Sequence, residues 1–198
     1  MTQTSRSKRE SEIAAIAIGA SAGGVDALLK ILGGLPANYR LPIFVVLHIR
    51  DDRESRLAAV FEQHVQIPVR QARDKEEIEE GVLYFAGPGY HLSVEQDRSF
   101  SLSGEDPVHY SRPAIDILMS SAADVYGSTL AGFLLTGANQ DGAEGLANIR
   151  QAGGLTVVQD PAEALIAIMP QAAIDRHQPD LILPLHDMHT LLIKLGTS

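Results

Sequence analysis

A short apolar segment that runs into a glycine-rich turn constrains this fold more than any other feature of the sequence. Residues 13–18 are all isoleucine or alanine, and residues 19–24 read Gly-Ala-Ser-Ala-Gly-Gly. Residues 25–32 then carry apolar side chains at the spacing of one helix face. The pattern predicts a buried strand, a tight turn that carries the Ser21 hydroxyl, and a helix whose first N–H groups are unpaired.

Two kinds of functional site use such a turn. The N-terminus of a helix binds phosphate groups, and it also stabilises an oxyanion next to a nucleophile. The dinucleotide fingerprint G-x-G-x-x-G does not fit, because Ser21 stands where the second glycine is required, and there is no G-x-x-x-x-G-K-[ST] loop. Residues 19–23 match the hydrolase pattern G-x-S-x-G. From the turn alone, a phosphate cradle, a serine nucleophile and a simple helix N-cap at Ser21 all stay open.

The composition limits the class of protein. A length of 198 residues fits one domain, and the lack of cysteine excludes disulfides, a thiolate nucleophile and zinc–sulfur sites. A net charge of −9 without a basic run argues against nucleic-acid binding. No apolar run approaches the roughly 20 residues of a membrane span, and residues 1–12 lack the apolar core of a signal peptide. We therefore expect a cytoplasmic protein without direct membrane insertion.

Apolar segments alternate with amphipathic segments along the chain. This alternation, with continuously apolar strands, predicts an α/β fold with a doubly wound, mostly parallel sheet and helices on both faces. An antiparallel hairpin is expected over residues 91–102, and residues 1–12 are expected to form a flexible tail before a domain at 13–198. The predicted strands are residues 13–18, 43–47, 82–86, 130–135, 155–158 and 181–183, and the predicted helices are residues 25–32, 53–64, 114–126, 142–152, a segment from 161, and 187–194.

Three polar residues follow strands of the predicted sheet. Ser21 follows the first strand, His48 ends the strand at 43–47, and Asp141 lies in the turn after the strand at 130–135. Sites in such sheets lie beyond the carboxyl ends of the strands, so the three side chains are expected at one edge. A hydrolase triad is defined by that geometry and not by sequence order. The structural alternatives are a hydrogen-bonding role for His48 and a helix N-cap at Asp141.

Several further motifs follow in order along the chain, at residues 87–92, 111–116, 135–137, 141–142 and 159–161. Together with the turn at 19–24 and the strand-end His48, they resemble the catalytic domain of the CheB-type chemotaxis protein-glutamate methylesterases, from Ile16 to Leu195. The resemblance implies hydrolysis of glutamyl methyl esters on the methylated cytoplasmic domain of chemoreceptors. Methanol would leave, and deamidation of certain receptor glutamines would be a second activity.

The resemblance also implies roles for individual residues. Ser21 is then the nucleophile, His48 the general base, and Asp141 the ionised residue that orients His48. The backbone N–H of Ala22 is the best candidate for an oxyanion donor. No metal and no cofactor are expected. The expected oxyanion and substrate-binding residues are Ala22, Gly23 and Ala138.

The chain departs from the family pattern in two places. Ala138 and Asn139 stand where the family usually has methionine and glycine, which leaves the shape of the pocket open. Family members often carry an N-terminal receiver domain, but only about a dozen residues precede the first strand here. We therefore expect a stand-alone catalytic domain. Control by phosphorylation would then come from a separate response-regulator protein, or be absent.

Other interpretations of the sequence stay open. One is a catalytically weak module that binds receptor helices, and another is an esterase for small esters with the same triad. Arg50, two residues after His48, would either solvate the rim of the site or meet an acidic receptor helix. His91 is expected to be structural or part of the cleft wall.

Overall fold

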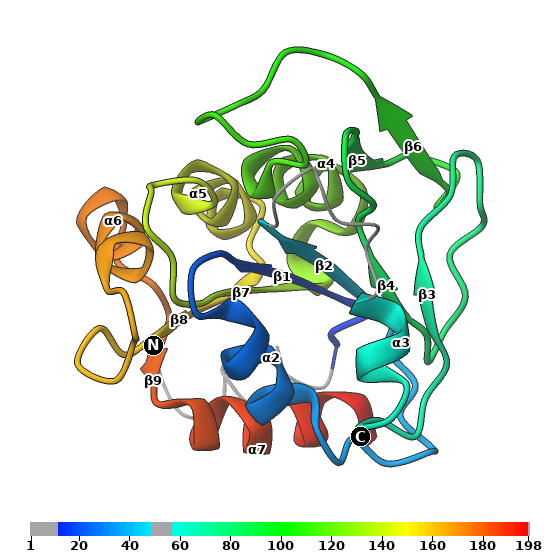
Figure 1. The fold of residues 1–198 in the computed structure, drawn as a ribbon, viewed down its shortest axis with the longest axis horizontal. Coiled ribbons are helices and arrows are strands. Elements are labelled where there is room, and N and C mark those ends of the chain that lie inside the picture. Colours follow the sequence, from blue (N-terminus) through cyan, green and yellow to red (C-terminus); the bar gives the residue numbers. More distant parts are fainter. Residues whose placement is uncertain (1–11, 49–56, 198) are drawn as a thin grey trace.

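The computed structural model of the chain describes residues 12–48 and 57–197. In these ranges seven parallel strands form one sheet in the order β3-β4-β2-β1-β7-β8-β9 (Figure 1). The order starts from β1 at the centre and runs outward on both sides, which is the doubly wound arrangement expected. The strands are β1 (Ala15–Ala20), β2 (Ile43–Leu47), β3 (Val69–Gln71), β4 (Leu83–Phe85), β7 (Leu130–Leu134), β8 (Leu155–Gln159) and β9 (Leu181–Leu183).

In the described part of the chain, three α-helices cover each face of the sheet (Figure 1). One face is covered by α2 (Gly24–Leu32), α3 (Leu57–Phe61) and α7 (Leu185–Thr197), and the other by α4 (Ile115–Tyr126), α5 (Ala143–Gln151) and α6 (Ile168–Arg176). A short 3₁₀ turn, η1 (Gly127–Thr129), joins α4 to β7. None of the helices in the described ranges has the length and apolarity needed to cross a membrane.

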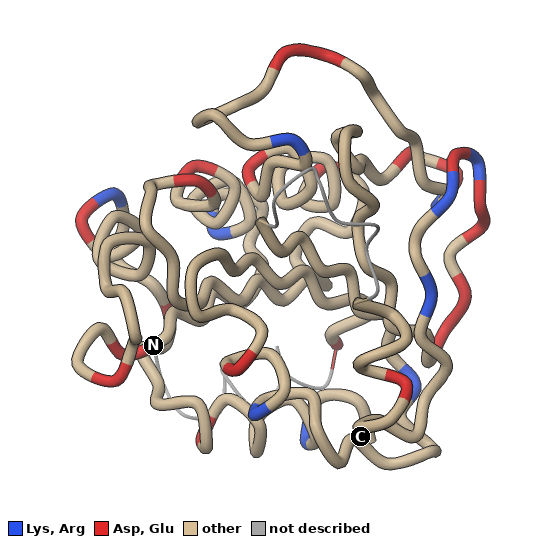
Figure 2. Tube along the Cα trace, in the orientation of Figure 1, with Lys and Arg blue, Asp and Glu red and all other residues tan. Residues whose placement is uncertain are grey.

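Two separate cores result from the alternation of side chains along the strands. In β1, Ile16 and Ile18 enter the core shared with α2 and α7, whereas Ala15 and Ala17 enter the core shared with α4 and α5. Figure 2 shows that most charged residues lie on helices and outer loops, and β1, β2 and β7 carry none, whereas the edge strand β3 carries Arg70. Because both faces of these strands are buried, they are apolar throughout, as the sequence predicts.

The antiparallel hairpin forms as expected, from β5 (His91–Val94) and β6 (Phe100–Ser103). It is a separate two-stranded sheet, so the main sheet is purely parallel. Phe100 contacts Phe44 and Tyr84 of the main sheet, with ring centroids 5.4 and 4.9 Å apart. The hairpin therefore extends the core over β2 and β4 by side-chain packing.

The structure differs from the sequence prediction at one predicted helix and at one strand that was not predicted. The helix predicted from residue 161 begins only at Ile168, because the carboxylate of Asp160 accepts the N–H of Ala162 and holds a turn there. Strand β3 was missed, since it has three residues and two of them are polar. Residues 53–56 of the predicted helix at 53–64 lie outside the described residues, and its described part ends at Phe61.

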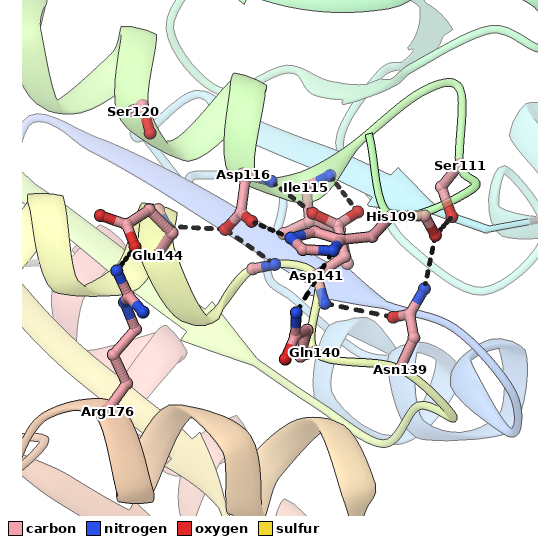
Figure 3. A network of polar contacts seen from close by, with 12 residues as sticks. His109, Ser111, Ile115, Asp116, Ser120, Asn139, Gln140, Asp141, Glu144 and Arg176 are labelled. Carbon is pink, nitrogen blue, oxygen red and sulfur yellow. Dashed lines mark hydrogen bonds and ion pairs between the residues drawn. The ribbon is translucent and has the colours of Figure 1, made fainter. Parts of the chain in front are cut away.

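Helices α4 and α5 cap each other (Figure 3). Neither has a side-chain cap from its own N-cap residue. The Asp141 carboxylate, just before α5, accepts the N–H groups of Ile115 and Asp116 at 2.8 and 2.9 Å. One oxygen of Asp116, in the first turn of α4, accepts the N–H groups of Gly142 and Gly145 at 2.9 and 2.7 Å. Each helix thus supplies the carboxylate that satisfies free N–H groups of the other.

Burying the ionised Asp116 in this role lowers the free energy of unfolding. Burial raises the pKa of Asp116 from 3.8 to about 6, and the charge of Asp141 adds to the rise, while hydrogen bonding from Gly145 and the nearby His109 oppose it. The folded chain therefore holds this proton more tightly than the unfolded chain does. This loss of stability is absent below pH 3.8, grows as the pH rises to about 6, and reaches its full size above that pH.

Asp116→Asn keeps an oxygen acceptor for the two glycine N–H groups but removes the charge. We expect its stability relative to the wild type to increase by up to about 3 kcal/mol between about pH 4 and about pH 7. Urea unfolding over that range measures the difference. Asp124→Asn, which neutralises an exposed carboxyl of the same helix, is the control. A difference between Asp116→Asn and wild type that does not change with pH would contradict the prediction.

The mutual capping requires a close approach of the two helices at Gly145. A Cβ atom there would lie 2.6 Å from Met119 Cβ and 3.1 Å from the carbonyl oxygen of Asp116. We expect Gly145→Ala to destabilise the fold by about 1–3 kcal/mol, since overpacking outweighs the helix-propensity gain of roughly 1 kcal/mol. Urea unfolding tests this against Gly104→Ala, whose added Cβ meets no atom within 4 Å. Equal stability of the two variants would refute it.

Candidate active site

A cleft of about 570 Å³ lies at the carboxyl edge of the sheet. Ser21 and His48 line it from one side, Ala138 and Asn139 from the turn after β7, and residues 107 and 109–113 from the loop before α4. The register of the sheet explains why Ser21 and His48 lie side by side. Ala20 pairs with Leu47, so Ser21 and His48 are the next residues of two paired strands.

The turn at Ser21 is tight and held at both ends. Its N–H donates to Thr136 O at 3.0 Å, and its carbonyl accepts the N–H of Gly24 at 2.7 Å. Gly23 has a φ of 80°, and a Cβ there would lie 2.8 Å from Leu165 Cδ2. In the described ranges, no protein group accepts a hydrogen bond from the N–H of Ala22 or Gly23. Among the described residues, these two N–H groups at the start of α2 therefore have no protein acceptor.

The imidazole of His48 is held by a buried carboxylate. The Nε2–H donates to Asp141 Oδ2 at 2.8 Å, and the side chains are 12% and 0% exposed. Nδ1 lies 3.3 Å from Ser111 Oγ. Because an ionised Asp141 can only accept, Nε2 carries a proton, and in the neutral ring Nδ1 then offers its lone pair. Among the described residues, no hydrogen bond joins His48 to Ser21.

Asp141 is an ionised carboxylate despite its burial. Burial by itself raises its pKa, but the hydrogen bonds from His48, Asp116 N–H and Ile115 N–H outweigh that effect and lower the pKa below 3.8. The oxygen that accepts the His48 proton also accepts Ile115 N–H, so the carboxylate cannot turn without losing both bonds. The N-cap alternative is therefore partly right, because Asp141 caps α4 and not the helix that follows it.

The loop before α4 contributes contacts that the sequence analysis missed. His109 and Tyr110 have φ angles of 50° and 63°, uncommon for such side chains. Asn139 Nδ2 donates to His109 O at 3.3 Å, and Ser111 Oγ lies 3.5 Å from the same carbonyl (Figure 3). Ser111 stands in the motif at 111–116, but no sequence pattern signals the backbone turn that aims it at His48.

The remaining expected residues lie as follows. Ala138 lines the cleft, and Met169 packs behind its turn, since a Cβ on Gly137 would lie 2.5 Å from Met169 Cε. His91 is fully buried and accepts Ala114 N–H at 3.1 Å, which confirms a structural role. Arg50 lies outside the described residues.

Comparison with known proteins supports the family suggested by these motifs. The family model described as CheB methylesterase matches residues 16–192. A relative from Leptospira interrogans is 45% identical over 184 residues, which cover 93% of this chain and 95% of the relative. A protein-glutamate methylesterase/protein-glutamine glutaminase from Clostridium acetobutylicum is 34% identical, over 98% of this chain and 56% of its own length.

A solved structure agrees with both the fold and the sequence match. The crystal structure of the Thermotoga maritima CheB methylesterase catalytic domain superposes with a TM-score of 0.87 at 30% identity, and the match covers 92% of this chain and 98% of that one. The family model covers nearly all of the described residues, and the structural match agrees with the parallel sheet. The chain belongs to the CheB methylesterase family.

Proposed function

We propose that this chain is a serine hydrolase that demethylates glutamyl methyl esters on chemoreceptors and deamidates certain receptor glutamines. One observation carries the proposal within the family: a buried His48–Asp141 pair opens into the cleft that Ser21 lines at the head of α2. A histidine with one nitrogen held by an ionised carboxylate and the other unprotonated is suited to act as a general base.

The proposed mechanism follows from this geometry. His48 Nδ1 removes the proton from Ser21 Oγ as Oγ attacks the ester carbonyl, and Asp141 stabilises the imidazolium that forms. The N–H of Ala22, with Gly23 beside it, binds the oxyanion. The imidazolium then protonates the leaving methoxide, so methanol departs. Water, activated by His48, cleaves the acyl-enzyme to a glutamate carboxylate, and with glutamine the leaving group is ammonia.

Ser111 must release His48 Nδ1 for this reaction. Its hydroxyl lies 3.3 Å from Nδ1 and 3.5 Å from His109 O, so it has a second acceptor close by. When the hydroxyl turns to the carbonyl, the Nδ1 lone pair becomes free for the Ser21 proton. In the resting enzyme, the Ser111 hydroxyl is thus a hydrogen-bond neighbour of His48 Nδ1, but it does not prevent Nδ1 from accepting the Ser21 proton.

The rim of the cleft is open to a protein substrate and presents exposed apolar side chains together with one cation. Leu165, 77% exposed, lies against Gly23, and Tyr110 is fully exposed on the opposite loop. Of the described residues that line the cleft, Arg112 is the single lysine or arginine, and none is acidic. The proposed partner is therefore the methylated cytoplasmic domain of a chemoreceptor, met in the cytoplasm by a catalytic domain spanning residues 13–198. A separate response-regulator protein is the proposed source of control.

Removing the nucleophile tests the whole proposal. We expect Ser21→Ala to lower methanol release from methylated chemoreceptor membranes by at least about 10³-fold, because no other group forms the acyl-enzyme. Ser128→Ala, at an exposed serine on η1, should match the wild type. A fluorophosphonate probe should label the wild type and Ser128→Ala but not Ser21→Ala.

The two readouts separate the alternatives. Equal methanol release from wild type and Ser21→Ala would reject the methylesterase. Labelling of Ser21 without methanol release would point to a small-ester esterase, and absence of both would point to a binding module.

Removing the charge that orients the base tests the role of Asp141. We expect Asp141→Asn to lower kcat by roughly 10³–10⁴-fold, because the amide favours the wrong imidazole tautomer. KM should change little, since Asp141 is buried behind His48 and away from the cleft. The measurement is methanol release under saturation, with Asp187→Asn, an exposed carboxyl on α7, as the matched control. A kcat within tenfold of wild type would reject the assigned role.

A further inference from the structure

Asp116 is a buried carboxylate that the proposed mechanism leaves unused. It is 8% exposed, and one oxygen accepts the N–H groups of Gly142 and Gly145. The other oxygen lies 3.4 Å from His109 Nε2. A carboxylate with a raised pKa is costly to bury, so its presence directly beside the site calls for a reason beyond helix capping.

The contacts of Asp116 fix the backbone that follows Asp141. Gly142, whose N–H it accepts, is the residue directly after Asp141. In return, Asp141 Oδ1 accepts the N–H of Asp116 at 2.9 Å. The turn that carries Asp141 is thus tied to the first turn of α4 in both directions (Figure 3). Without the Asp116 side chain, the N–H groups of Gly142 and Gly145 lose their acceptor, and the turn that carries Asp141 keeps only the bond from the backbone N–H of residue 116.

The charge of Asp116 adds to this mechanical effect. The ionisable groups that face it are His109, from the loop before α4, and Asp141, from the turn before α5. His48, from the end of β2, lies on the other side of Asp141. Two carboxylates therefore stand behind one imidazole in a buried region, where charges are weakly screened. A second negative charge favours the imidazolium that forms during attack.

We propose that Asp116 is a positioning residue of the hydrolytic reaction, which holds Asp141 against His48 and favours the protonated imidazole by its charge. The reaction itself rests on the proposed function, but the effect on His48 is a property of the folded chain and is measurable without substrate.

Asp116→Asn separates charge from structure, because the amide oxygen keeps the acceptor for the glycine N–H groups. We expect the midpoint of the acidic limb of kcat/KM against pH to move down by about half a unit, since a lost negative charge disfavours the imidazolium. The maximal kcat should fall by about three- to tenfold with KM unchanged within about twofold. Asp124→Asn, on the exposed side of the same helix, should reproduce the wild-type profile.

The same shift is measurable on the free protein. The ring nitrogens of His48, followed by NMR against pH, should titrate with a midpoint about half a unit lower in Asp116→Asn than in wild type or Asp124→Asn. This measurement keeps its meaning if the wild type releases no methanol, in which case the proposed function fails alone. Coincident His48 titrations in all three proteins would overturn the charge effect.

A second variant tests the mechanical effect. Asp116→Ala removes the acceptor of Gly142 and Gly145 as well as the charge, so its kcat should fall further than that of Asp116→Asn, by about 10²-fold. In its NMR spectrum, the His48 Nε2 proton that is bonded to Asp141 should exchange faster with water. Wild-type kcat and wild-type exchange in Asp116→Ala would overturn the positioning role, as would a loss of kcat equal to that of Asp116→Asn.

Discussion

The exchange of carboxylates between α4 and α5 is the interaction on which the site depends. A helix N-terminus that is buried needs acceptors for its free N–H groups, and here each helix takes its acceptor from the other. The carboxylate that caps α4 is also the one that holds His48. A requirement of the fold and a requirement of the chemistry are therefore met by the same group, Asp141, and neither can change alone.

This arrangement explains why a residue at the end of β2 is held by a turn after β7, although β1 lies between the two strands. Asp141 reaches His48 because α4 presents its N-terminus at the carboxyl edge of the sheet and draws the turn toward it. The glycines where α5 meets α4 help to place Asp141 in this position. Gly145 lets α5 approach α4, and Gly142 follows Asp141 with a φ of 93°.

The sequence predicted the parallel sheet and the edge at which Ser21, His48 and Asp141 gather, because apolar strands and glycine turns are local signals. It could not predict contacts that depend on unusual backbone or distant chain. Ser111 reaches His48 through two residues with positive φ that no local pattern marks. The loop before α6 is held not only by the local Asp160 carboxylate but also by the Thr136 hydroxyl, which accepts the N–H of Ile166 from 30 residues away.

The orientation of the His48 ring has a consequence for how the site tolerates change. In the chymotrypsin-type triad Nδ1 faces the aspartate and Nε2 reaches out to the serine. Here Nε2 faces Asp141, so the nitrogen turned to the Ser111 hydroxyl is the one nearer the backbone and has the shorter reach. The proposed nucleophile, Ser21, and the proposed base, His48, must then come from adjacent strands in fixed alignment. A slip of β1 against β2 by one residue, about 3.3 Å, would separate them, so strand register becomes a determinant of reactivity.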